Sequence, residues 1–174
     1  MPSFGPVYGT YMSESGGDVA WTDPTNMEGP PDAASATATL TAAQATATAS
    51  LLFGDALALV IPPTARITSI SINVRASDST YDPETGQASI STQFVDGTPI
   101  GVAILASTTA TGLTTYTLTG TWGFVWTRAR VENIRVAFFM SSLLGSNVGC
   151  DSVWLSGTYS AGGGRSRSRL TRSR

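Results

Sequence analysis

Polar and apolar residues alternate along the segment from Arg66 to Arg75, RITSISINVR. In an extended chain Ile70, Ile72 and Val74 fall on one side, and the serine and asparagine residues between them fall on the other. A helix with 3.6 residues per turn would scatter the same residues around its surface. The segment therefore predicts a β-strand with one buried face.

Seven further segments combine β-branched residues, alternation and flanking turn formers. They are residues 37–40, 45–53, 87–95, 99–105, 114–119, 134–140 and 151–159. Alternating threonine in the second of these favours a strand over a helix, and Asp96-Gly97 is typical of a two-residue hairpin turn. A single helical turn is predicted at 127–133, and no other segment has helical length and spacing. Eight short strands separated by turns indicate an all-β fold, a single β-sandwich of the jelly-roll type.

The length of 174 residues suits one domain. We expect the sandwich to occupy residues 19–160. Residues 1–18 are rich in glycine, proline and serine and predict an N-terminal arm or an edge segment. Residues 161–174 predict a glycine-hinged, arginine-rich C-terminal arm. No stretch reaches the ~18 apolar residues of a membrane-spanning helix, and the first six residues do not resemble a signal peptide, so we expect no membrane partner.

The chain contains no histidine, no lysine and one cysteine, Cys150. These counts exclude a Ser-His-Asp triad, a histidine-ligated zinc site, a Schiff-base lysine and an internal disulfide. Cys150 has no histidine to activate it and is expected to be a small buried residue. We therefore expect a protein that is not an enzyme and that needs no cofactor.

Three carboxylates lie close together in the segment Asp78 to Glu84. Calcium prefers oxygen ligands of this kind, but the segment lacks the spacing of an EF-hand loop. A solvated hairpin loop explains the same residues, so we expect no metal site.

Charge is distributed unevenly along the chain. Residues 1–164 contain five arginines and all twelve acidic residues, a formal charge of −7, whereas five arginines lie in the last ten residues. These are Arg165, Arg167, Arg169, Arg172 and Arg174. The arginine guanidinium can bind either a carboxylate or a phosphate in bidentate fashion. The arm therefore predicts an acidic partner, either a neighbouring protein subunit or a nucleic acid, and a solvated tail is the alternative.

Two tryptophans, Trp122 and Trp126, are separated by three residues, so in a strand they point to the same side. Exposed aromatic rings in β-sandwich proteins can stack on sugars, whereas buried ones form the core or an interface. Both a glycan site and a packing role are consistent with this pair.

Three patches resemble a β-sandwich family found in virion proteins of tailed bacteriophages. The first is Trp21 to Asn26 followed by Gly29 and the Asp32-Ala33-Ala34 stretch, the second is IPPTARITSISI at 61–72, and the third runs from Trp122 through residues 126–133 to DSVWLSGTY at 151–159. The resemblance implies a fold and a setting rather than a catalytic site, and the arginine arm has no counterpart in it.

The resemblance implies a non-enzymatic structural protein of a phage particle, made in the host cytoplasm and located in the virion. Its expected role is neck, collar or tail attachment or capsid decoration. Its expected partners are capsid, portal, connector or tail subunits and further copies of itself. A surface rich in threonine, serine, alanine and glycine suits such assembly because few charges must be desolvated. The alternatives are a carbohydrate-binding module that recognises host surface glycans through Trp122 or Trp126, and a capsid protein whose arm contacts the genome.

Overall fold

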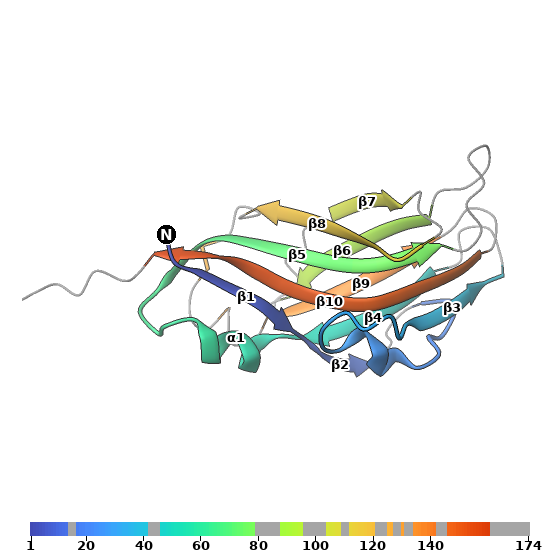
Figure 1. Cartoon of the computed structure of the whole chain (residues 1–174), viewed down its shortest axis with the longest axis horizontal. Coiled ribbons are helices and arrows are strands. Elements are labelled where there is room, and N and C mark those ends of the chain that lie inside the picture. The colour runs from blue at the N-terminus through green and yellow to red at the C-terminus, as the bar shows by residue number, and fades with distance from the viewer. Residues whose placement is uncertain are drawn as a thin grey trace, which may run out of the picture.

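Two antiparallel sheets of five strands each form a jelly-roll-like sandwich in the computed structural model, as the sequence predicts (Figure 1). The structure describes residues 1–13, 17–41, 46–78, 88–95, 104–108, 112–120, 125–126, 130, 134–141 and 146–160. The first sheet has the order β1-β10-β5-β8, with β3 also paired to β10, and the second has the order β2-β4-β9-β6-β7. The strands are β1 Ser3–Tyr8, β2 Thr10–Ser13, β3 Ala36–Leu40, β4 Thr46–Leu52, β5 Arg66–Asp78, β6 Ala88–Val95, β7 Ile104–Thr108, β8 Thr114–Gly120, β9 Arg135–Ser141 and β10 Ser146–Ser160.

The two longest strands, β5 and β10, pair along the centre of the first sheet. On its other edge β10 pairs with β3 through residues 146–150 and with β1 through residues 154–158. These two short strands therefore follow one another along a single edge, and a gap is left between them at residues 151–153. The register between β10 and β5 shifts at the same point, between Cys150 and Ser152, which marks Asp151 as a β-bulge residue.

The first thirteen residues, expected to be an arm or an edge segment, form edge strands of both sheets. β1 pairs with β10 in the first sheet, and β2 pairs with β4 in the second. Phe4 and Val7 of β1 are buried in the core. This segment therefore closes one side of the sandwich.

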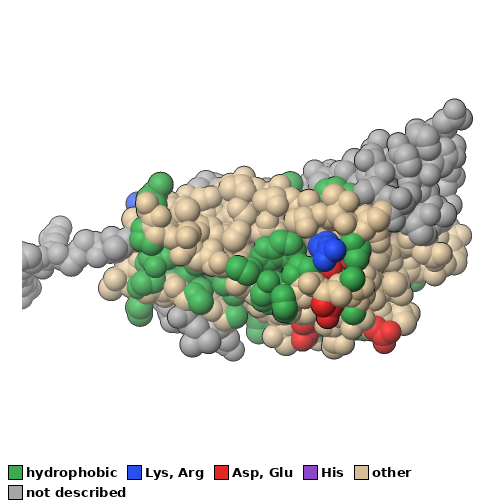
Figure 2. Space-filling view, in the orientation of Figure 1, with side chains coloured by type: hydrophobic (Ala, Val, Ile, Leu, Met, Phe, Trp, Pro, Cys, Tyr) green, Lys and Arg blue, Asp and Glu red, His purple; other side chains and the backbone are tan. Residues whose placement is uncertain are grey.

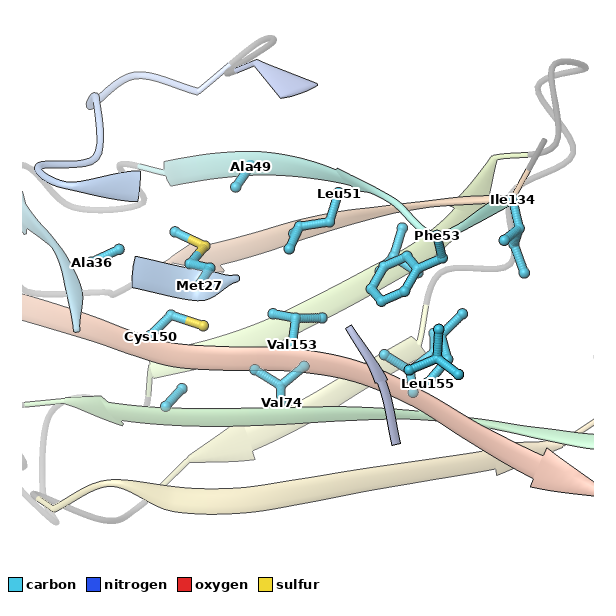
Figure 3. Packing of buried hydrophobic residues seen from close by; sticks show 14 of the residues in the cluster. Met27, Ala36, Ala49, Leu51, Phe53, Val74, Ile134, Cys150, Val153 and Leu155 are labelled. Atoms are coloured by element: carbon cyan, nitrogen blue, oxygen red, sulfur yellow. The ribbon is translucent and has the colours of Figure 1, made fainter. Parts of the chain in front are cut away.

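The core lies between the sheets and follows the alternation of the strands. Ile70, Ile72 and Val74 of β5 are fully buried, as the sequence predicts. Val74 and Val153 of the first sheet and Leu51 of β4 lie in the core between the sheets (Figure 3). Cys150 is also fully buried and free, which confirms its predicted role as a small core residue. Its burial raises the pKa of the thiol far above the ordinary value.

A helix that the sequence analysis did not predict connects the two sheets. α1 spans Gly54–Val60 between β4 and β5, and Leu57 points into the core. The Leu57 amide donates to the Phe53 carbonyl oxygen at 2.9 Å, and the Ile61 amide donates to the Leu57 carbonyl oxygen at 3.0 Å. The helix ends at Val60, because Pro62 cannot donate a backbone hydrogen bond and disfavours helical geometry at Ile61 before it. Within the described part of the chain, no helix is long and apolar enough to cross a membrane.

Four further expectations differ from the structure or lie wholly or partly outside its described part. β7 is described from Ile104, and the earlier part of the strand expected at 99–105 lies outside the described residues. Ser146 and Asn147 belong to β10, where a turn was expected. β6 and β7 do pair as antiparallel neighbours, but the Asp96-Gly97 turn lies outside the described residues. Of the predicted helical turn at 127–133, the structure describes Arg130, whose backbone is helical.

Candidate functional site

Aromatic and polar side chains form one row across the outer face of the first sheet. Val153 and Leu155 of β10 point into the core, so Trp154 between them points outward. In the strand register Tyr8 of β1 lies opposite Trp154, and Asn73 of β5 lies opposite Trp154 on the other side. Thr117 of β8 lies opposite Asn73 and completes the row. Both aromatic rings are partly exposed.

Asn73 holds the middle of this row in place. Its side-chain amide donates to the Trp154 carbonyl oxygen at 3.3 Å and to the Ser156 hydroxyl at 3.1 Å. Its side-chain oxygen accepts a hydrogen bond from the Thr117 hydroxyl at 2.8 Å. Asn73 is only 6% exposed, so these contacts fix the polar groups around Trp154 rather than offer the amide itself to a ligand.

A ladder of hydroxyl groups continues from this row over the rest of the outer face. The hydroxyls of Ser71 and Thr119 lie 2.6 Å apart, and those of Thr68 and Thr158 lie 2.9 Å apart. Thr115, Thr117 and Thr119 of β8 all point outward and are exposed. A hydroxyl has one donor and two acceptor sites, so each can bind a further group while keeping its neighbour.

An ion pair borders the aromatic row on one side. The Arg75 guanidinium on β5 donates to the Asp151 carboxylate at 2.8 Å, with Arg75 29% exposed and Asp151 fully buried. The other carboxylate oxygen accepts hydrogen bonds from the Asp32 and Ala33 amides at 3.2 and 3.1 Å. The bulge at Asp151 therefore directs its carboxylate toward both the arginine and the loop before β3.

The loop before β3 fills the gap between β1 and β3 along the edge of β10. Besides the two amides held by Asp151, the Ser152 hydroxyl donates to the Gly29 carbonyl oxygen at 2.7 Å. Gly29 and Ala33 have φ angles of 82° and 70°. For alanine this left-handed conformation is costly, so the contacts from β10 hold the loop in a shape that it would not keep alone.

Figure 2 shows this face of the molecule. Apolar side chains gather over its middle, next to basic and acidic side chains, and uncharged polar groups cover much of the surrounding surface. The five strands of this sheet carry four charged side chains, Arg66, Arg75, Asp78 and Asp151. The face is thus mostly neutral, with aromatic rings beside hydroxyl groups and one anchored guanidinium.

Of the residues predicted to bind a glycan or a partner, Trp126 is within the described part of the chain. Trp126 is 4% exposed and belongs to the hydrophobic core, so its ring packs and is not open to a ligand. Trp122 and the arm residues Arg165, Arg167, Arg169, Arg172 and Arg174 lie outside the described residues, as does most of the acidic loop 78–84. Among the residues that the structure describes, no three acidic, cysteine or histidine side chains gather as a metal site.

None of the residues of the outer face is among the glycan-binding or partner-binding residues predicted from the sequence. Trp154 did carry a signal, because it is a single aromatic residue on the polar side of an alternating strand. Tyr8 and Arg75 carried none of their own, since their proximity to Trp154 depends on strand pairing across the chain.

No protein-family model and no curated protein matches the sequence. Among solved structures, the CBM22-1–GH10 modules of Clostridium thermocellum endo-1,4-β-D-xylanase 10B, complexed with xylohexaose, align over 88% of this chain and 28% of that chain, with 10% identity and a TM-score of 0.51. TmCBM61 in complex with β-1,4-galactotriose aligns over 84% of this chain and 90% of that chain, with 12% identity and a TM-score of 0.48. The enzymatically active domain of tailspike protein 4 from bacteriophage CBA120 aligns over 84% of this chain and 19% of that chain, with 13% identity and a TM-score of 0.48. The neighbours are β-sandwich-like, and at these identities the likeness concerns the fold alone.

Proposed function

We propose that this chain is a non-enzymatic carbohydrate-binding domain, and that it binds glycans on the outer face of the first sheet. The observation that carries the proposal is the pairing of Tyr8 with Trp154 beside exposed threonine hydroxyls. A pyranose ring presents C–H groups on its faces and hydroxyl groups around its edge. An aromatic ring packs well against the C–H groups, and the fixed hydroxyl groups of the protein can form hydrogen bonds with the sugar hydroxyls.

The site differs from the one expected on the sequence. Trp126 is buried, whereas Trp154 is partly exposed and is oriented by the contacts of Asn73 with its backbone and with Ser156. A binding face built on paired strands is rigid, so little ordering is required when a ligand binds. The xylanase 10B modules that share this fold contain xylohexaose in their structure, and this likeness supports the fold and not the ligand.

A glycan array with the full chain tests the proposal. Trp154→Ala and Tyr8→Ala should each weaken binding of the recognised glycan by about tenfold or more, about 1.4 kcal/mol. Met12→Ala is the matched control, because this apolar side chain is 50% exposed on β2 of the other sheet. Trp154→Phe keeps an aromatic ring and should retain part of the affinity. Thermal unfolding of each variant separates lost binding from lost folding, and unchanged binding by both folded alanine variants would refute the site.

A virion setting is the second candidate, and the charge distribution favours it. A body of charge −7 with five arginines at its end can join copies of itself or other virion proteins in a phage particle. This role and glycan binding are compatible, since a particle protein can carry a glycan-binding face. We propose that the arm binds acidic protein subunits, with packaged nucleic acid as the alternative partner.

Deletion of residues 162–174 tests the role of the arm. If the arm joins subunits, the truncated protein will be missing from particles, and normal incorporation would contradict this role. If the arm binds duplex phosphates with all five arginines, DNA binding should weaken with salt at a log-log slope of about −4.5. A slope near zero would exclude the genome-contacting alternative.

A further inference from the structure

Arg75 lies on the same outer face as the row formed by Tyr8, Trp154, Asn73 and Thr117, at the next outward-facing position of β5 after Asn73. On β5 it is two residues after Asn73, which lies opposite Trp154, and it lies directly opposite Ser152 of β10. Residues related diagonally in this way lie about 7–8 Å apart, within reach of a long side chain. A single sugar residue resting on Trp154 can therefore extend a substituent to the guanidinium.

The guanidinium of Arg75 has donors to spare. It carries five N–H groups, and among the described residues its hydrogen-bond partner is one oxygen of Asp151. The side chain is 29% exposed, so the remaining donors can be reached from solvent. Its position is fixed, because the carboxylate that holds it is fully buried and is itself held by two backbone amides.

The carboxylates of Asp151 and Asp32 near Arg75 already accept hydrogen bonds from the protein. The negative charge of Asp151 is shared among Arg75 and the amides of Asp32 and Ala33, and all three contacts use its two oxygens. The other charges on the strands of this sheet are Arg66 and Asp78, at the two ends of β5. The nearby Asp32 carboxylate accepts a hydrogen bond from the Ala34 amide within its own loop. A planar guanidinium with free N–H groups matches the two oxygens of a carboxylate.

We propose that the face recognises an acidic glycan, an inference that rests on the proposed function. A sugar ring packs on Trp154 and Tyr8, and the carboxylate of the same sugar binds Arg75. Asp151 is then a positioning residue that orients the guanidinium without touching the ligand. A neutral sugar makes the same aromatic contacts, but only its hydroxyl groups can accept hydrogen bonds from the spare N–H groups of Arg75. The carboxylate therefore sets the preference, and the aromatic rings supply the common part of the affinity.

Matched ligands test the preference without altering the protein. The probes are oligogalacturonate, oligoguluronate and hyaluronan oligosaccharides, each compared by calorimetry with its carboxyl-reduced form. We expect at least one intact acidic probe to bind about tenfold or more tightly than its reduced form, and this advantage to shrink as salt is added. Equal binding of intact and reduced forms for every probe would overturn the proposal.

Variants of the ion pair assign the preference to Arg75. Arg75→Lys keeps the charge but loses the planar fork, so binding of the acidic form should weaken severalfold more than binding of the reduced form. The double variant Arg75→Gln/Asp151→Asn replaces the pair by two amides and should abolish the advantage. If both folded variants keep the full preference, Arg75 is not the binding group. If no probe of either kind binds, and Trp154→Ala leaves the glycan-array binding of the chain unchanged, the proposed function fails as well as the preference for acidic glycans.

Discussion

Asp151 is the residue on which most contacts around the outer face converge. It is fully buried, pairs with Arg75 and accepts two amides of the loop before β3. Asp151→Asn keeps an oxygen for the loop but removes the charge opposite the arginine. We expect a loss of about 1–3 kcal/mol in the free energy of unfolding, measured by urea denaturation. Asp23→Asn, at an exposed position with left-handed backbone that asparagine tolerates, should change this free energy by less than about 0.5 kcal/mol. Equal effects of the two substitutions would contradict the role of Asp151.

Cys150 is the residue for which the structure makes the simplest chemical prediction. Burial raises the pKa of its thiol, so the thiol stays protonated in the folded protein. A thiol reagent should therefore label none of the native protein at neutral pH and one site per chain in denaturant. The contribution of this thiol to stability is complete below the pKa of the unfolded thiol, about 8.5, and declines as the pH rises above it. Rapid labelling of the native protein would contradict the buried position.

The contact between β1 and β10 depends on a glycine. A Cβ atom at Gly157 would collide with the Ser69 carbonyl oxygen and lie 2.7 Å from the Phe4 ring. Gly157→Ala should lower the free energy of unfolding by about 1–3 kcal/mol, because backbone of β5 and the ring of β1 must move. Gly112→Ala is the control, since a Cβ there meets nothing within 4 Å. Chemical denaturation of both variants measures the difference, and equal stability would contradict the strand packing described above.

Strands with clear alternation could be predicted from the sequence, and other elements could not. β5 was evident because Ile70, Ile72 and Val74 alternate with polar residues. The α1 segment, GDALALV, carries a short run of apolar residues that fits a helix or a strand equally well, so pattern alone cannot decide between them. The edge strands β1 and β2 contain glycine and proline or are very short, and their pairing with β10 and β4 is a tertiary effect.

The candidate site could not be predicted because it is a product of register. Tyr8 and Trp154 lie near opposite ends of the chain and meet because β1 pairs with β10. Arg75 and Asp151 meet at a bulge, where the register shifts by one residue. Trp126 and Trp154 each follow a valine in the sequence. Trp126 is nevertheless only 4% exposed, because its ring faces the core. Sequence pattern assigns sides of a strand, whereas strand pairing decides which side chains meet on a face.

For the whole molecule, the sandwich should fold without its last residues. β10 ends at Ser160, and the core residues of the described chain all precede it. A chain ending at residue 160 should therefore keep its free energy of unfolding within about 0.5 kcal/mol of the full chain. Circular dichroism with urea denaturation measures this value, and a loss of several kcal/mol would show that the arm is part of the fold.

The outer face of the first sheet is the central claim, and NMR titration of the full chain tests it most directly. Amide and side-chain signals are followed while neutral and acidic oligosaccharides are added. Glycan binding on this face predicts that the largest shifts occur at Tyr8, Asn73, Arg75 and Trp154, including the Trp154 indole N–H. Shifts confined to the second sheet, or no shift with any oligosaccharide, would contradict it.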